Sequence, residues 1–118
     1  MSLNKQVTTM TKLKLPDPIA AYFEADKRDA EALVQFFTGQ ATVKDEGRIH
    51  SGTAAIKAWK TEVSAKYKYT SEPFGIEQKD GDYMVTSRLT GHFPGSPVDL
   101  QYTFRLEGNK IAFLEIAL

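Results

Sequence analysis

A change of hydrophobic period along the chain is the sequence feature that most constrains its fold. Up to residue 67, apolar residues recur mainly at three- and four-residue intervals, which is typical of helices, with one alternating stretch at 41–46. From residue 69 onward, apolar and polar residues alternate between turn pairs, which is typical of strands joined as hairpins. Helices gathered early and strands gathered late predict an α+β fold, because a parallel α/β sheet needs strands and helices that alternate.

The first two helices are predicted from their end signals. Asp17 is expected as the N-cap of the first helix, with Pro18 in the first helical position, and apolar residues follow at helical spacing. Asp29 is expected to cap the second helix, and Gly39 to end it in a left-handed conformation. The apolar residues of these two helices are Ile19, Tyr22, Phe23, Ala30, Leu33, Phe36 and Phe37.

The third helix is predicted to follow the cap sequence Ser51-Gly52-Thr53. Its apolar residues lie on one stripe, which we expect to pack against the sheet through Trp59. That stripe contains Ile56, Trp59, Val63 and Tyr67, and the polar residues expected off it are Lys57, Lys60 and Glu62.

The strands are predicted by alternation and by their turns. Asp80-Gly81 and Gly108-Asn109 are favoured two-residue hairpin turns, and the segment 94–97, PGSP, is a third turn. In the strand before the last, the apolar face holds Val98, Leu100, Tyr102, Phe104 and Leu106. The expected order is ααβαββββ, with helices on one face of a curved antiparallel sheet.

The last strand gives an expectation about assembly. Glu115 is on the same face as Ile111, Phe113 and Ala117, so we predict that this face is the outer one and partly apolar. A partly apolar outer sheet face indicates a homodimer that pairs through it.

Composition limits the remaining classes. The 118 residues fit one domain, at 15–118, after a polar, partly disordered tail at 1–14. Fifteen basic and fifteen acidic residues argue against a nucleic-acid partner, and no apolar run is long enough to suggest a membrane partner. Cysteine is absent, which excludes disulfides and thiolate chemistry, and no early apolar run indicates export. A cytoplasmic location is the expectation.

Asp45 is the first candidate for chemistry. In the stretch 41–46 it shares a face with Ala41 and Val43, whereas Lys44 and Glu46 point the other way. A carboxylate on the apolar face of a sheet gains basicity, which suits a general base. The alternative is a turn residue whose side chain bonds nearby backbone N–H groups, since Asp before Glu-Gly is common turn chemistry.

Tyr22 and Tyr102 are candidate hydrogen-bond donors. Each lies on the apolar side of its element, so both hydroxyls are expected to reach the same interior. There they would either stabilise a substrate oxyanion or serve as core aromatics satisfied by backbone carbonyls.

His50 and Arg48 flank a glycine turn, where His50 would either act as an acid or base or lie in solvent. Two histidines far apart in sequence do not form a metal-ligand pattern, so no metal or cofactor is expected. The side chains expected to bind a small apolar or carbonyl-containing ligand are Phe23, Phe37, Arg48, Trp59 and Phe104.

Two long segments carry a family resemblance. PIAAYFEADKRDAEALVQFFTGQATVKDEGRIHSGTAAIKAW and GHFPGSPVDLQYTFRLEGNKIAFLEI resemble the SnoaL-like and ketosteroid-isomerase-like branch of the nuclear-transport-factor-2-like superfamily. The resemblance covers about residues 16 to 118. It implies a cone-shaped roll, in which a curved antiparallel sheet wraps around helices and encloses a ligand cavity, and a dimer formed through the outer sheet face.

The resemblance also implies roles for three residues. Tyr22 matches the helix tyrosine that donates to the substrate oxygen in the isomerases, and Asp45 matches their proton-shuttling base. Tyr102 occupies the place of the protonated aspartate in that pattern, where a tyrosine still donates a hydrogen bond but fills more of the cavity. The expected function is an isomerase, cyclase or lyase acting on a carbonyl-containing apolar metabolite; the alternative is a non-catalytic ligand-binding or accessory dimerisation module.

Overall fold

The computed structural model describes residues 13–118, so most of the predicted tail lies outside the described residues. Its elements are α2 (Asp17–Ala25), α3 (Ala30–Val34), β1 (Phe37–Asp45), β2 (Arg48–Ser51), α4 (Thr53–Lys66), β3 (Tyr69–Lys79), β4 (Asp82–Gly91), β5 (Val98–Glu107) and β6 (Lys110–Ala117). This is the predicted α+β order, with the short strand β2 added. None of the helices in 13–118 is long and apolar enough to cross a membrane.

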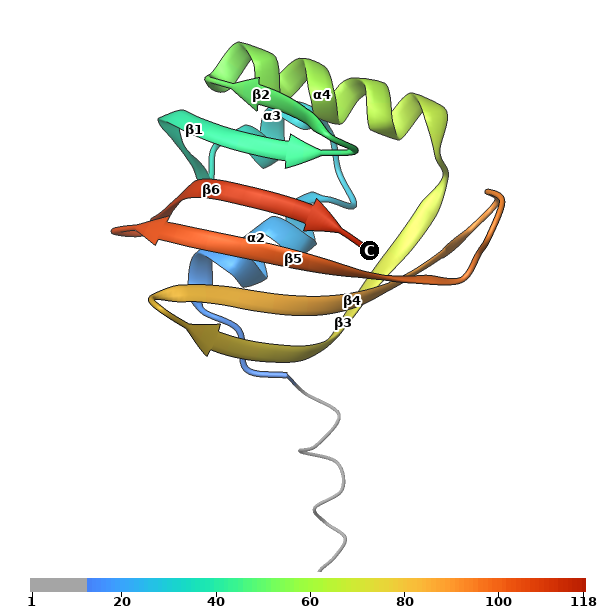
Figure 1. Cartoon of the computed structure of the whole chain (residues 1–118). Helices are drawn as coiled ribbons and strands as arrows, with labels where there is room; N and C mark the ends of the chain where they lie inside the picture. Colours follow the sequence, from blue (N-terminus) through green and yellow to red (C-terminus); the bar gives the residue numbers. More distant parts are fainter. Residues whose placement is uncertain (1–12) are drawn as a thin grey trace, which may run out of the picture.

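The six strands form one curved sheet in the order β2-β1-β6-β5-β4-β3. Every neighbouring pair is antiparallel except β1 and β6, which run parallel. Figure 1 shows α2 and α3 behind the sheet, and α4 along the end of the sheet formed by β2. The helices therefore cover one face of the sheet, as predicted, and the other face is left open.

The core lies between that inner face and the helices. Tyr22 and Phe23 of α2 pack edge-to-face against Tyr102 and Phe104 of β5, with ring centroids 5.1–6.2 Å apart. Such edge-to-face pairs stabilise a core beyond the area that they bury. Phe37 joins the same cluster through Tyr22, at a centroid distance of 6.1 Å.

Two predicted helix ends need correction. The first helix has Pro16 as its N-cap and no side-chain cap, so Asp17 is its first residue rather than its cap. The second helix has the predicted Asp29 cap, whose carboxylate accepts from Ala32 N–H at 3.0 Å, but it ends at Val34. Gly39 lies inside β1, because Phe37 already pairs with β6 and the strand begins there.

Hairpin turns connect the strands. The predicted turn at Asp80-Gly81 has positive φ at both residues, 53° and 85°, and joins β3 to β4. Glu46-Gly47 has the same character, with φ of 54° and 78°, and joins β1 to the additional strand β2. Positive φ at both positions is what a type I′ hairpin turn requires.

The inward and outward faces of β6 differ from the prediction at one residue. Ile111 is fully buried, although it was expected on the outer face with Phe113 and Glu115. The register between β5 and β6 shifts after Arg105, so the alternation of side chains changes between Ile111 and Phe113. Leu114 is consequently buried and Glu115 pairs with the exposed Lys44.

Gly91 ends β4 where two backbone segments approach closely. A Cβ atom at this position would lie 2.0 Å from the Lys68 carbonyl oxygen, so no larger residue fits without a backbone shift. The next residue, His92, donates its N–H to the same carbonyl at 3.2 Å. The loop after Gly91 is thereby held beside the junction of α4 and β3.

Candidate functional site

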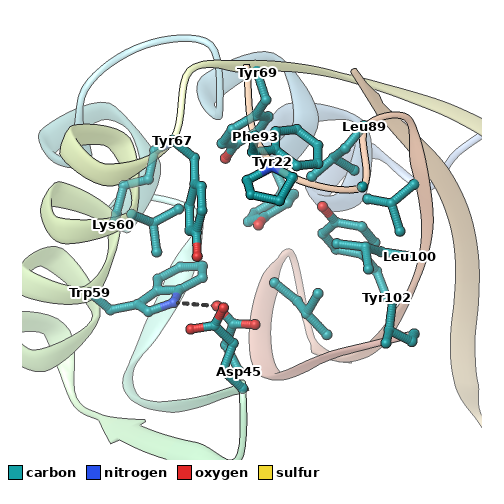
Figure 2. A pocket seen from close by; sticks show the side chains of 17 residues that line it. Tyr22, Asp45, Trp59, Lys60, Tyr67, Tyr69, Leu89, Phe93, Leu100 and Tyr102 are labelled. Atoms are coloured by element: carbon teal, nitrogen blue, oxygen red, sulfur yellow. Dashed lines mark hydrogen bonds between the residues drawn. The ribbon is translucent and has the colours of Figure 1, made fainter. Parts of the chain in front are cut away.

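A pocket of about 420 Å³ opens between α4, the inner face of the sheet and the loop after β4. Its aromatic lining residues are Tyr22, Trp59, Tyr67, Tyr69, Phe93 and Tyr102, and its aliphatic ones are Val63, Leu89, Val98, Leu100, Ile116 and Leu118. Figure 2 shows these side chains around one space, with Asp45 at one end. A mostly apolar lining with a few polar groups is typical of a small-molecule site.

Asp45 lies at the end of β1, where the strand's inward parity directs its side chain into the pocket. Its Oδ2 accepts a hydrogen bond from the Trp59 indole Nε1–H at 3.0 Å. Burial raises the pKa of the Asp45 carboxyl above its ordinary value of 3.8, while the Trp59 hydrogen bond opposes that rise. Asp45 is thus a half-buried carboxylate at an apolar wall, directly followed by the turn at Glu46-Gly47.

Tyr22 and Tyr102 line the same pocket and are almost fully buried. Burial raises the pKa of both phenols, and the negative charge of Asp26 adds to the rise. Both residues therefore stay protonated across the physiological pH range and are able to donate a hydrogen bond. Figure 2 shows the two hydroxyls directed towards the interior of the pocket, above Asp45.

A buried polar network stands beside the pocket. Lys60 Nζ donates to the Asp26 carboxylate at 2.7 Å and to the Asp26 backbone carbonyl at 2.9 Å. The Tyr69 hydroxyl donates to the same carboxylate, at 3.1 and 3.2 Å from its two oxygens. The side chains of Lys60 and Asp26 are only 2% and 6% exposed, and Lys60 and Tyr69 both line the pocket.

The prediction that Lys60 lies off the buried stripe was wrong. Lys60 follows Ile56 by four residues and precedes Val63 by three, so helical geometry puts it on that stripe. Its residue type favoured a solvent position, but Asp26 at the C-terminus of α2 supplies a buried partner. The helical spacing of Lys60 was a signal in the sequence that it lies on the buried stripe. No signal in the sequence indicated that Asp26, 34 residues earlier, is its partner.

The other predicted site residues lie elsewhere. His50 is on β2, half-buried, with its ring 6.1 Å from that of Trp59, and Arg48 is exposed on the same strand. Neither residue lines the pocket. Phe23, Phe37 and Phe104 are buried in the core rather than in the pocket wall.

Thus the structure brings Tyr22, Asp45, Trp59 and Tyr102 together, out of the residues predicted from the sequence. It adds Glu46, Lys60, Tyr67 and Tyr69 as polar lining residues. Glu46 was expected to point away from Asp45, but it belongs to the turn after β1 and lines the same pocket. Across residues 13–118, no group of three or more His, Cys, Asp or Glu side chains is arranged to hold a metal ion.

Proteins similar to this chain are found among solved structures. No family model matches the chain, and no curated protein matches it. A candidate polyketide cyclase from Sinorhizobium meliloti is 39% identical, with 86% of this chain and 94% of that chain covered and a TM-score of 0.82.

Two more distant structures share the fold. A protein with a ketosteroid-isomerase-like fold from Catenulispora acidiphila, solved in complex with trimethylamine, is 18% identical, with 89% of this chain and 87% of that chain covered and a TM-score of 0.78. TerC, co-crystallised with polyporic acid, is 16% identical, covers 88% of this chain and 92% of its own, and has a TM-score of 0.72.

A curved sheet closed by helices around a mostly apolar pocket defines the class of cone-shaped α+β folds. Within that class, the chain belongs to the family of the candidate polyketide cyclase from Sinorhizobium meliloti, and it shares the nuclear-transport-factor-2-like and ketosteroid-isomerase-like fold of the more distant structures. The resemblance predicted from the sequence is confirmed.

Proposed function

We propose that this protein binds a small, mostly apolar carbonyl compound in its pocket and transfers a proton at the carbon next to the carbonyl, as an isomerase, cyclase or lyase. One observation carries the proposal. Asp45 is a half-buried carboxylate at an apolar wall, and burial raises its pKa above 3.8. Raised basicity at a ligand-facing position is what a general base requires.

The proposed reaction uses three side chains. Asp45 removes a proton from the carbon, the electron pair of the C–H bond moves into the carbonyl, and an enolate forms. Tyr22 and Tyr102, which are buried and protonated, donate hydrogen bonds to the enolate oxygen. Asp45 then returns the proton, to the same carbon or to another one.

Two further residues act through Asp45 in this proposal. Trp59 fixes the carboxylate by its hydrogen bond to Oδ2, and Oδ1 is the oxygen that takes the substrate proton in this proposal. His50 lies beside Trp59, and its positive charge, when protonated, favours the ionised form of Asp45. Arg48 has no part in the reaction as proposed, because it is exposed on β2.

The test uses 2-tetralone, an apolar two-ring ketone with acidic C–H groups on both sides of the carbonyl. Deuterium exchange at those carbons is followed by NMR. We expect Asp45→Asn to slow protein-catalysed exchange by about 10²- to 10⁴-fold. Glu62→Gln, an exposed carboxylate change on α4, is the matched control and should leave exchange unchanged. Unchanged exchange in Asp45→Asn would refute the base assignment, and a loss in Glu46→Gln alone would transfer it to Glu46.

A second candidate is a binding protein without catalysis. The pocket combines six aromatic residues with the carboxylates of Asp45 and Glu46, and aromatic faces beside carboxylates attract ammonium groups. The Catenulispora acidiphila structure with trimethylamine is consistent with such a ligand class. Saturable binding of trimethylammonium, lost in Asp45→Asn, together with no exchange of 2-tetralone by the natural protein, would favour this candidate.

We also propose that two copies pair through the outer sheet face. Phe113 of β6 lies on that face, only half-buried, with the Arg105 guanidinium 5.5 Å from its ring centroid. A second copy would cover this ring, which favours association. Sedimentation velocity should give a dimer mass that falls to the monomer mass in Phe113→Lys, and a monomer mass for the natural protein would refute the proposal.

A further inference from the structure

We propose that Lys60 and Tyr69 form a second recognition point in the pocket, which binds a neutral oxygen of the ligand, a hydroxyl or a carbonyl, at the end opposite Asp45. This inference deepens the proposed function and rests on it. It defines the ligand class more closely, as an apolar body with one carbonyl at Asp45 and a second oxygen function at its far end.

Lys60 has a hydrogen-bond donor to spare. Its ammonium group carries three N–H donors, and two of them are used by the Asp26 carboxylate and the Asp26 backbone carbonyl. Among the residues that the structure describes, no further acceptor for Nζ is within hydrogen-bond distance. Because Lys60 lines the pocket and is 2% exposed, a ligand oxygen is the acceptor that would satisfy the third donor.

Tyr69 supplies the complementary group. Its hydroxyl proton is directed to the Asp26 carboxylate, so its oxygen retains lone pairs that can accept a hydrogen bond. Lys60 Nζ lies 5.8 Å from the centroid of the Tyr69 ring, so the two side chains form one point on the wall. A donor beside an acceptor is the arrangement that a ligand hydroxyl needs, since it makes both kinds of bond.

The separation of this point from Asp45 sets the shape of the ligand. Figure 2 shows Tyr69 and Asp45 at opposite ends of the pocket, with Tyr22 and Tyr102 between them. The volume of about 420 Å³ leaves room for a ligand larger than one carbonyl group and its neighbouring carbons. A two-ring ligand would therefore place its carbonyl among Asp45 and the central tyrosines and its second oxygen at Lys60.

Charge selects a neutral oxygen over an anionic one. Asp26 neutralises Lys60, so the pair offers little net attraction for an anion. Asp45 and Glu46 add two carboxylates to the lining of the same pocket. A ligand carboxylate would meet like charge there without an unpaired cation to compensate it, which costs binding free energy.

Three probes test the inference: 2-tetralone, 6-hydroxy-2-tetralone and 6-carboxy-2-tetralone, with dissociation constants measured by calorimetry. We expect the hydroxy compound to bind roughly 5- to 10-fold more tightly than 2-tetralone, which corresponds to one net hydrogen bond, and the carboxy compound to bind less tightly than either. Tyr69→Phe and the charge-neutral pair Asp26→Asn/Lys60→Met should reduce the hydroxy preference to about one. Lys57→Met, an exposed change on the same helix, should retain it.

The outcomes separate this inference from the proposed function. Asp45→Asn should lose deuterium exchange but keep the preference for the hydroxy probe. Equal affinities for the hydroxy compound and 2-tetralone in the natural protein, or a preference that survives in Tyr69→Phe, would overturn the second recognition point while exchange by Asp45 still stood. Failure of all three probes to bind would overturn both.

Discussion

Two carboxylates at the pocket differ in burial and in hydrogen bonding: Asp45 lines the pocket, and Asp26 lies behind the lining residues Lys60 and Tyr69. Asp26 is buried and accepts hydrogen bonds from Lys60 and Tyr69, so its charge is fully compensated. Asp45 is half-buried and has a single side-chain donor, Trp59, in the described part of the chain. A satisfied carboxylate holds elements together, whereas an incompletely satisfied one is available for a ligand.

The position of Asp26 explains why it needs so many partners. It is the C-cap residue of α2, where the helix dipole disfavours a negative charge and backbone carbonyls lack partners. Lys60 answers both requirements, because it pairs with the carboxylate and donates to the Asp26 carbonyl. The network thereby joins α2, α4 and β3 at the side of the pocket.

The largest expected effect is on the Asp26 end. Lys60→Met should lower the free energy of unfolding by about 3–5 kcal/mol, because it leaves the Asp26 charge buried without a cation, with only the Tyr69 hydroxyl as a side-chain donor. Urea unfolding measures this loss, and Asp26→Asn/Lys60→Met should recover a large part of it. Lys57→Met, whose exposed ammonium pairs with Glu31, is the control. If Lys60→Met and Lys57→Met lowered the free energy of unfolding equally, Asp26 would not depend on Lys60.

The next effect concerns the Asp45 end and depends on pH. Because burial raises the pKa of Asp45 above 3.8, the folded protein holds this proton at pH values where the unfolded chain has released it. The contribution of Asp45 to stability therefore falls as pH rises from about 3.8 through its folded pKa. As pH rises through this range, the free energy of unfolding of the natural protein should fall relative to that of Asp45→Asn, which has no carboxyl at this position. Glu62→Gln is the control and should follow the natural protein. Parallel profiles for Asp45→Asn and the natural protein would contradict the raised pKa.

The smallest effect is expected on the outer sheet face, where ion pairs are exposed. Arg88 donates to both oxygens of Asp99, at 2.8 and 3.1 Å, but both side chains are open to solvent. Exposed pairs contribute little because water and salt screen them. Asp99→Asn should leave the thermal midpoint almost unchanged at high salt. If Asp99→Asn lowered the thermal midpoint as much as Lys60→Met does, the contrast between buried and exposed ion pairs would be wrong.

Much of the fold could be predicted because its signals are local. The Asp29 cap and the Asp80-Gly81 turn are each encoded within a few residues, and strand parity alone directed Asp45 inward. The Glu46-Gly47 turn was equally local, but four residues of β2 are too few to establish a period of their own.

The pocket could be predicted only in part, because its remaining groups depend on distant contacts. Lys60 is buried only because Asp26 meets it from another helix, and a lysine by itself indicates solvent. His50 was expected at the chemistry from its place in the sequence, yet the turn at Glu46-Gly47 places β2 at the edge of the sheet, where His50 lies beside Trp59 and outside the pocket lining. Local sequence patterns indicate neither the pairing of Lys60 with Asp26 nor the position of β2 in the sheet.

The parallel pairing of β1 with β6 has a consequence for synthesis. In this pair Asp45 aligns with Ile116, so the strand that carries the proposed base is completed by residues made some seventy positions later. During translation, β1 and its hairpin partner β2 emerge early, but the inner edge of β1 stays unpaired until β6 has left the ribosome. A nascent chain that has not yet made β6 therefore lacks Ile116 of the pocket lining and has an unpaired edge on β1.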